Sequence, residues 1–210
     1  MEGTYFYLFF WFIWIVATFL MKKTGERTRL AAFALAMISS ASLTVEIGVV
    51  RATLAFFVLF LCSCYAAIER RPCRLPFLAL SASGLAFAYA AFRLLALFDP
   101  VWIWLDGQWM LAWWLVIVSS LFHRRFAARL LCLALGGCQG EAVYAMAIHR
   151  MAPDYVLGSF SFFDAAAISA SCLLIWEMIR FLSLQLEEKR PVRSIPVRSF
   201  SGDLIKKSPL

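Results

Sequence analysis

The chain has 210 residues, of which 63 % are hydrophobic and only 16 % charged, whereas soluble domains carry about 25 % charge. This composition excludes an ordinary water-soluble protein. The net charge of +7 comes from basic residues that stand in small groups between apolar runs, which indicates membrane topology and no nucleic-acid partner. The six cysteines fall in apolar runs or in a segment predicted to be cytoplasmic, so no disulfide framework is predicted.

The first apolar run, Thr4 to Met21, is predicted to be an uncleaved membrane span. It follows the acidic residue Glu2 and is followed at once by Lys22 and Lys23. A cleavable signal peptide has the opposite charge order and small residues at its cleavage site. The basic flank therefore predicts that this span ends in the cytoplasm and that the N-terminus is outside.

The next apolar region, Leu30 to Ile68, is about twice as long as a helix that crosses a hydrocarbon core of about 30 Å. It is predicted to form two spans joined by a turn at residues 45–51, where Gly48 coincides with the charged residues Glu46 and Arg51. The remaining four spans are predicted at residues 75–98, 108–122, 126–148 and 160–184.

The basic residues test this scheme, because Lys and Arg in short loops collect on the cytoplasmic side. When the loops are assigned alternately, only Arg51 and Arg150 fall outside. The predicted inner set is Lys22, Lys23, Arg27, Arg29, Arg70, Arg71, Arg74, Arg124, Arg125, Lys189, Arg190, Arg193, Arg198, Lys206 and Lys207. Removal of any one span would move every later loop to the other side and destroy this bias.

The predicted fold class is therefore all-α, a polytopic transmembrane bundle of seven spans with the N-terminus outside and the C-terminus cytoplasmic. The transmembrane domain covers residues 1–184. Residues 185–210 form a basic tail that contains Pro191, Pro196 and Pro209 and is predicted to be disordered. Beyond the lipid bilayer itself, the expected partner of this tail is the anionic lipid headgroup.

Four ionisable residues, Glu46, Arg93, Glu141 and Asp164, are predicted to lie in the outer half of the bundle. A charge inside the bilayer is costly, so such groups usually face the bundle interior and are paired. One interpretation is a polar cluster that opens outward, in which Arg93 balances the acids. In the other, Arg93 extends to the headgroups, Asp164 caps the start of the last span, and Glu46 belongs to the turn. Glu141 fits the second interpretation least well, because it is too deep and too short to reach the surface.

Glycines in the sixth predicted span favour an inward-facing Glu141. Gly136 and Gly140 form a Gly-xxx-Gly pair that permits close approach of another helix. At helical spacing, Gly137 lies on the same face as Gly140, Glu141 and Tyr144. This face is predicted to be a helix-packing surface, although a locally unwound stretch that lines a cavity is the alternative.

Motifs of catalysis are not found in the sequence. Two histidines, His123 and His149, flank span ends, and no metal-binding, phosphate-binding or nucleophile motif accompanies them. We expect no enzyme activity, no catalytic residues, no cofactor and no metal.

Three short strings resemble the YphA-like family of small membrane proteins from spore-forming bacilli. They are the opening Met1-Glu2-Gly3-Thr4-Tyr5-Phe6-Tyr7, the end of the aromatic first span at Met21-Lys22-Lys23, and the turn Val45-Glu46-Ile47-Gly48. The resemblance implies a bacterial plasma membrane location and carries over no functional residue. The proline-containing tail departs from it.

The resulting expectation is a non-enzymatic membrane protein that acts through helix packing or through assembly, either as a homo-oligomer or with a membrane-protein partner. The alternative is a transporter or receptor for a small solute, an ion or a proton, with an outward-facing polar site between helices.

Overall fold

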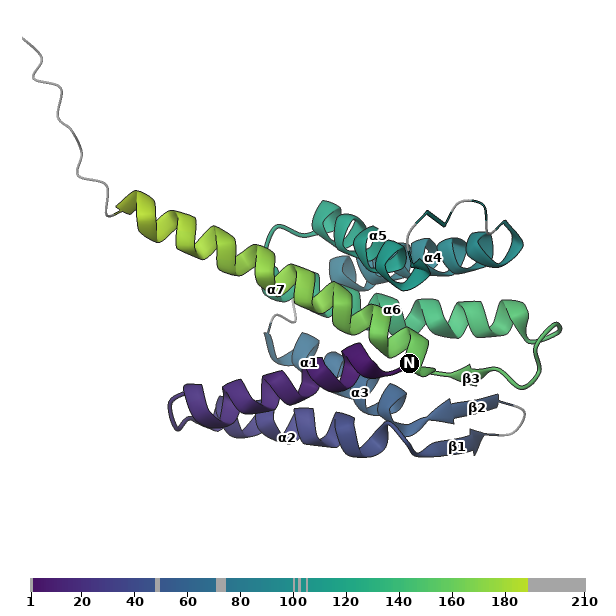
Figure 1. Ribbon diagram of the computed structural model, residues 1–210, viewed down its shortest axis with the longest axis horizontal. Coiled ribbons are helices and arrows are strands. Elements are labelled where there is room, and N and C mark those ends of the chain that lie inside the picture. Colours follow the sequence, from purple (N-terminus) through teal and green to yellow (C-terminus); the bar gives the residue numbers. More distant parts are fainter. Residues whose placement is uncertain are drawn as a thin grey trace, which may run out of the picture. The chain divides into compact units, whose positions relative to one another are not determined.

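The computed structural model describes residues 2–47, 50–70, 75–99, 101, 103–104 and 106–188. This part of the chain is predominantly helical (Figure 1). The helical elements are α1 (Thr4–Ile15), the π-helical η1 (Val16–Leu20) that continues it, α2 (Gly25–Ser40), α3 (Leu54–Arg70), α4 (Leu75–Phe98), α5 (Gly107–Phe122), α6 (Phe126–Ile148) and α7 (Phe160–Glu188).

The positions of these helices agree closely with the apolar runs of the sequence. The predicted spans 75–98 and 126–148 coincide with α4 and α6, and α5 begins one residue before the predicted span 108–122. The predicted span 160–184 starts where α7 starts, and α7 continues to Glu188. Hydropathy therefore located these helices well, because an apolar run must end where the chain meets charged or turn-forming residues.

Three of the described helical segments are long and apolar enough to cross a membrane: Leu75–Phe98, Phe126–Ile148 and Phe160–Leu186. Three shorter apolar segments accompany them: Thr4–Leu20, Leu54–Glu69 and Gly107–Phe122. The predicted class of helical membrane bundle is thus confirmed at this level.

A small sheet, which an all-α prediction does not include, occupies the place predicted for the turn. Strands β1 (Thr44–Ile47) and β2 (Val50–Thr53) pair antiparallel, and β3 (Val156–Leu157) pairs parallel with β2. The β-branched residues of β1 and β2 favour extended backbone. The Thr53 hydroxyl adds a hydrogen bond to the Gly158 carbonyl at 2.7 Å, which ties β2 to the end of the β3 segment.

The chain divides into two units, residues 1–177 and 178–210. The first contains the helices up to the middle of α7 together with the sheet. In the second, the described residues 178–188 are helical. The predicted boundary at 184/185 therefore lies inside a helix, and residues 189–210 of the predicted tail lie outside the described residues.

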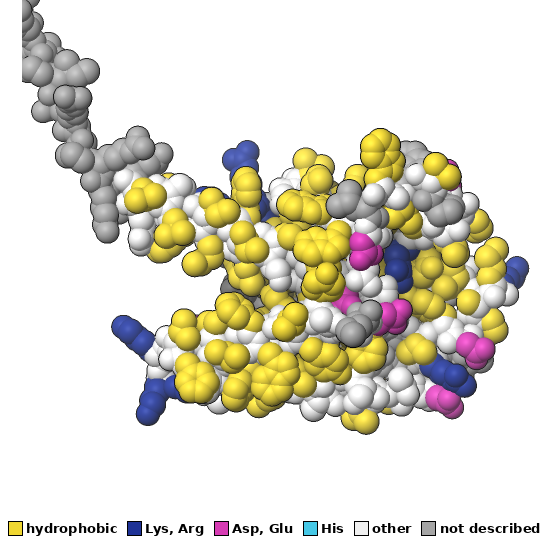
Figure 2. Space-filling view, viewed as in Figure 1, with side chains coloured by type: hydrophobic (Ala, Val, Ile, Leu, Met, Phe, Trp, Pro, Cys, Tyr) yellow, Lys and Arg dark blue, Asp and Glu magenta, His cyan; other side chains and the backbone are white. Residues whose placement is uncertain are grey.

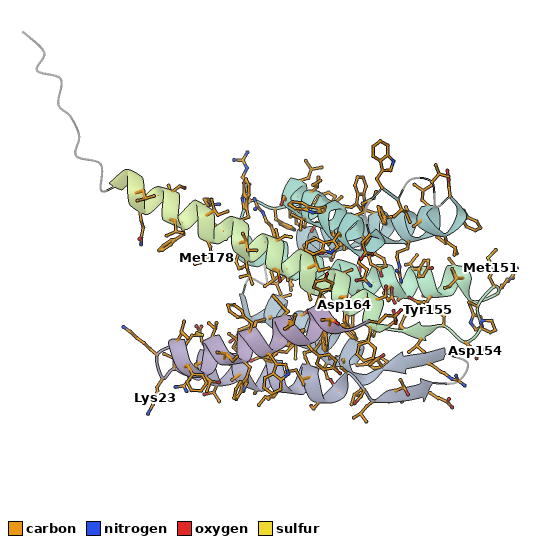
Figure 3. The ribbon with its side chains drawn as sticks, viewed as in Figure 1. Lys23, Met151, Asp154, Tyr155, Asp164 and Met178 are labelled. Atoms are coloured by element: carbon orange, nitrogen blue, oxygen red, sulfur yellow. The ribbon has the colours of Figure 1, made fainter. Side chains whose placement is uncertain are left out.

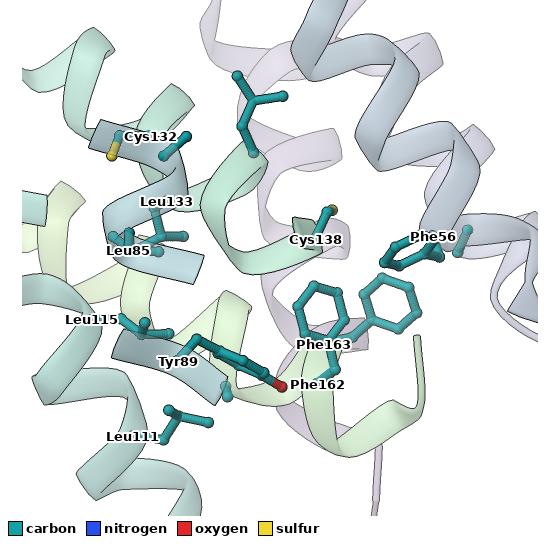
Figure 4. Packing of buried hydrophobic residues seen from close by; sticks show 14 of the residues in the cluster. Phe56, Leu85, Tyr89, Leu111, Leu115, Cys132, Leu133, Cys138, Phe162 and Phe163 are labelled. Atoms are coloured by element: carbon teal, nitrogen blue, oxygen red, sulfur yellow. The ribbon is translucent and has the colours of Figure 1, made fainter. Parts of the chain in front are cut away.

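The core of the first unit combines aromatic rings with small side chains. Phe162 of α7 is a central element, since its ring centroid lies 6.2 Å from that of Phe56 and 6.1 Å from that of Tyr89 (Figure 4). Buried alanines such as Ala82 and Ala86 on α4 let neighbouring helices approach closely. On the outside, hydrophobic side chains cover much of the face seen in Figure 2, as expected for a surface in contact with lipid.

The two ends of the first unit differ in charge and in structure. At one end, around Lys23, Arg29 of α2 forms an ion pair of 2.8 Å with Glu69 of α3 (Figure 3). At the opposite end lie the sheet and the segment with Met151 and Asp154 (Figure 3). We call these the lysine end and the hairpin end.

Candidate functional site

Glu141 of α6 is the centre of the most extensive polar arrangement among the described residues. Its side chain is completely buried. The Tyr89 hydroxyl on α4 donates to Oε2 at 2.5 Å, and the Tyr155 hydroxyl donates to Oε1 at 2.6 Å. A buried carboxylate is tolerated only when its oxygens accept hydrogen bonds, and here each oxygen has a phenol donor.

Arg93 of α4 joins this arrangement through Tyr155. Nη2 of Arg93 donates to the Tyr155 hydroxyl at 3.2 Å, and Nη1 donates to Oγ of Ser161 at 3.3 Å. The guanidinium carbon also lies 5.0 Å from the ring centroid of Tyr144, within cation–π range. The cation and Glu141 are therefore linked by a shared tyrosine hydroxyl, which accepts from one and donates to the other.

We call this set the tyrosine–glutamate network; it comprises Tyr89, Arg93, Glu141, Tyr144, Tyr155 and Ser161. Tyr155 lies outside the helices, in the segment between α6 and β3 (Figure 3). Burial and the negative charge of Glu141 raise the pKa of Tyr155 well above its ordinary value. Tyr155 therefore keeps its proton at neutral pH and remains a hydrogen-bond donor to the carboxylate.

The glycines of α6 bring Glu141 to its partner on α4. A Cβ at Gly136 would lie 2.8 Å from the Ala82 carbonyl oxygen, and a Cβ at Gly140 would lie 2.8 Å from Cβ of Tyr89. Both distances are shorter than side-chain contacts allow, so only glycine fits this crossing. The contacts advance by one turn on both helices together, which shows that α4 and α6 run parallel.

Gly137 faces a different neighbour. A Cβ there would lie 3.5 Å from the Phe162 ring of α7, which is an ordinary van der Waals contact. Of the three glycines predicted to pack helices, Gly136 and Gly140 thus lie against α4 and Gly137 lies against α7.

Asp164 of α7 binds the start of α1 and takes no part in the network. It is completely buried; Oδ2 accepts from the Gly3 amide at 2.7 Å and Oδ1 accepts from the Phe6 amide at 2.8 Å. These are two of the amides that a helix leaves unpaired at its N-terminus, where the helix dipole also favours an anion. The expectation that Asp164 caps its own helix is therefore corrected, because it caps α1.

Glu46 also lies apart from the network, at the surface of the hairpin. Its Oε1 accepts from Nε of Arg51 on the paired strand at 3.1 Å, and both side chains are exposed. Arg51 additionally approaches Asp154 at 3.9 Å. Of the four polar residues predicted to cluster, the structure brings together Arg93 and Glu141 and places Glu46 and Asp164 at two other sites.

Three tyrosines and a serine of the network were not among the predicted cluster. Tyr89 precedes Arg93 by one helical turn, a spacing that places both on one face. Tyr144 shares a face with Glu141 and was predicted there, although without a polar role. Tyr155 lies in an irregular segment, where no periodicity indicates the direction of a side chain.

A second polar contact lies at the junction of α5 and α6. Nε2 of His123 is 2.7 Å from Oγ of Ser81, and both residues are buried. Oγ of Ser81 also lies 2.9 Å from the Leu78 carbonyl oxygen. The contact between His123 and Ser81 therefore links the end of α5 to α4. Burial and the nearby Arg129 lower the pKa of His123.

Comparison with known proteins places these features in a family. The sequence model of the YphA-like integral membrane proteins matches residues 2–194. The chain belongs to this family. The match covers the tyrosine–glutamate network, the Asp164 cap and the hairpin.

A curated relative within the YphA-like family comes from Bacillus subtilis (strain 168). It is described as "Uncharacterized protein YphA" and is 31 % identical over 193 residues, covering 90 % of this chain and 94 % of the relative. No solved structure matches the chain.

Proposed function

We propose that this YphA-like protein is a non-enzymatic, multi-pass protein of the bacterial plasma membrane that acts through helix packing and assembly, as a homo-oligomer or with another membrane protein. The observation that carries the proposal is that the hydrogen bonds of the Glu141 carboxylate come from other parts of the same chain. Both of its carboxylate oxygens accept hydrogen bonds from tyrosine hydroxyls on two other parts of the chain. The buried charge is thus used to hold α4, α6 and the α6–β3 segment together.

The proposal includes seven spans, with the N-terminus and the hairpin end outside. Alternate assignment of the loops leaves only Arg51 and Arg150 outside, and this bias supports that topology. The α1–α2 and α5–α6 junctions at the lysine end, opposite the sheet, also support it (Figure 1). Reporter fusions test the topology. A reporter that is active only in the cytoplasm should give a signal when it is fused at Arg124. A signal from a reporter that is active only outside the cell would overturn the scheme.

The structural role of the network is tested with Glu141→Gln and with Asp154→Asn as the control, since the side chain of Asp154 is 91 % exposed. A glutamine cannot accept from both tyrosines with equal strength, because one of its two polar atoms is a donor. We expect less folded protein for Glu141→Gln in size-exclusion profiles and unchanged proton uptake by proteoliposomes per folded molecule. Asp154→Asn should behave as the unmodified protein.

A second candidate function is proton or small-solute coupling at the same residues. It is favoured by one observation: Arg93 and Tyr155 are only partly buried, and Tyr155 is bonded directly to the fully buried Glu141. This chain of hydrogen bonds links the hairpin end to a carboxylate inside the bundle. If Glu141→Gln remains folded and abundant but loses proton or solute flux, this second function is the correct one.

A further inference from the structure

An apolar recess lies between α4 and α5, away from the tyrosine–glutamate network. Its volume is about 280 Å³, and its walls are formed by Ala88, Ala91, Phe92, Leu95 and Ala96 on α4 and by Met110 and Trp114 on α5. Ile103 of the α4–α5 connection also lines it. The α4 wall combines three alanines with the larger Phe92 and Leu95, and the short alanine side chains leave this space.

The wall of the recess is held in place by a polar contact. Nε1 of Trp114 donates to the Ala88 carbonyl at 3.3 Å, which orients the indole ring across the gap between the helices. The exposed fraction is 44 % for Trp114 and 43 % for Leu95. The recess is therefore open on the outer surface of the two helices, which faces lipid in a membrane protein. The opening is therefore a lateral one, between two helices.

The chemistry of the recess restricts what fills it. An apolar cavity of this kind does not hold water. The lining is almost wholly apolar and the recess lies between two helices. A hydrocarbon chain matches this lining, because it brings no polar group that would lose its hydrogen bonds there.

The charges next to the recess indicate the headgroup. The amide of Asp99 donates to the carbonyl of Leu95, and the amide of Met110 donates to the carbonyl of Asp106, so each acid lies one helical turn from a residue of the recess. The connection from Asp99 to Asp106 contains these two acids and no Lys or Arg. Acidic groups at this level attract a cationic headgroup and repel an anionic one.

We propose that the α4–α5 recess binds one acyl chain of a phospholipid with an ammonium headgroup, of the phosphatidylethanolamine class. The lipid belongs to the leaflet on the side of the α4–α5 connection. Its chain lies along Ala88–Leu95 and against Trp114, and its ammonium group lies beside Asp99 and Asp106.

The test is photo-crosslinking of the full-length protein in vesicles that contain a phosphatidylethanolamine with a diazirine in its acyl chain. Mass spectrometry then locates the adducts. We expect adducts at Ala88–Leu95 and Met110–Trp114 to exceed, several-fold, those at the exposed residues Leu80 and Leu121. Uniform adducts over all exposed residues would overturn the site.

Variants and a second probe complete the test. Ala91→Phe fills the recess and should reduce its adducts to the level of Leu80, whereas Ala79→Phe, on an exposed position of the same helix outside the recess, should leave them unchanged. If Ala91→Phe does not fold, Ala96→Leu serves the same purpose. Equal numbers of recess adducts in Ala91→Phe and Ala79→Phe would overturn the site. A phosphatidylglycerol probe with the same acyl chain should label the recess less than the phosphatidylethanolamine probe does. Equal labelling by the two probes would overturn the headgroup preference.

Discussion

The hydroxyl of Tyr155 donates to Oε1 of Glu141 at 2.6 Å, across 14 positions of the sequence. This bond connects an irregular segment outside the helices to a carboxylate inside the bundle. Because the same hydroxyl accepts from Arg93, removal of one oxygen atom disturbs both charged residues. A single substitution at Tyr155 therefore tests the link between Arg93 and Glu141.

Tyr155→Phe should lower the free energy of unfolding by about 1.5–3 kcal/mol, the usual contribution of a hydrogen bond to a charged group. It should also make the α6–β3 segment more accessible to protease. The measurements are a denaturant titration in mixed micelles and limited proteolysis. Tyr65→Phe is the control, because Tyr65 on α3 is 62 % exposed. Equal stability of the two variants would contradict the role given to Tyr155.

Gly140→Ala should be destabilising by about 1–3 kcal/mol, since an added methyl group meets the Tyr89 side chain at 2.8 Å and the Ala86 carbonyl at 2.9 Å. Gly137→Ala is the matched control on the same helix, because its methyl group makes only an ordinary contact with Phe162. Gly137→Ala should be neutral or stabilising, as alanine favours a helix more than glycine does. Thermal unfolding of the two purified variants makes the comparison, and a reversed order would refute the α4–α6 crossing.

Asp164→Ala should loosen the start of α1. The substitution leaves the Gly3 and Phe6 amides without their acceptor, at a cost of about 1–3 kcal/mol for each buried donor. Hydrogen exchange of the N-terminal peptide should accelerate, while exchange in α4 and α6 should change little. Asp154→Asn again provides the control. Unchanged exchange at Gly3 and Phe6 would show that another group caps α1.

His123 should make the protein less stable in mild acid. Its pKa is lowered in the folded state by burial and by Arg129, so the unfolded chain binds a proton more readily. The resulting loss in the free energy of unfolding is absent above the pKa of the unfolded histidine, which is about 6.5. The loss grows as the pH falls from there to the pKa of His123 in the folded protein.

The matched variant is His123→Gln, whose side-chain amide can hydrogen-bond with Ser81 as donor or acceptor but does not titrate. Thermal unfolding between pH 7 and pH 5 should shift more for the unmodified protein than for His123→Gln. Carboxylates elsewhere contribute to both curves equally, so the difference isolates His123. Parallel curves would exclude the histidine as the cause.

The helices were predictable from the sequence, whereas the small sheet was not. Apolar runs such as 75–98 and 126–148 end at charged or turn-forming residues, which a hydropathy pattern detects directly. Residues 44–53 lie within one long apolar region. The charged residues and the glycine located the turn, but the uniform hydropathy gave no signal for strands β1 and β2 beside it. Strand β3, of two residues, depends on its pairing with β2 and has no pattern of its own.

The candidate site was predictable only in part, for a related reason. Depth in the predicted span and the neighbouring glycines indicated that Glu141 faces the interior, and its side chain is indeed completely buried. One of the two interpretations paired Arg93 with Glu46, Glu141 or Asp164. In the structure Tyr155 lies between Arg93 and Glu141, and no local pattern reveals a partner from an irregular segment. For Asp164, a local capping rule suggested its own helix, whereas a tertiary contact supplied the donors.

The bond between Asp164 and the Gly3 amide joins residues 161 positions apart. During synthesis the first helix leaves the ribosome long before α7 does. Its leading amides must therefore remain hydrated, or bound to other groups, until α7 has been made. Stop codons anywhere before Asp164 would release a chain whose first helix never receives its acceptor, and such fragments should be preferred substrates for membrane-protein quality control.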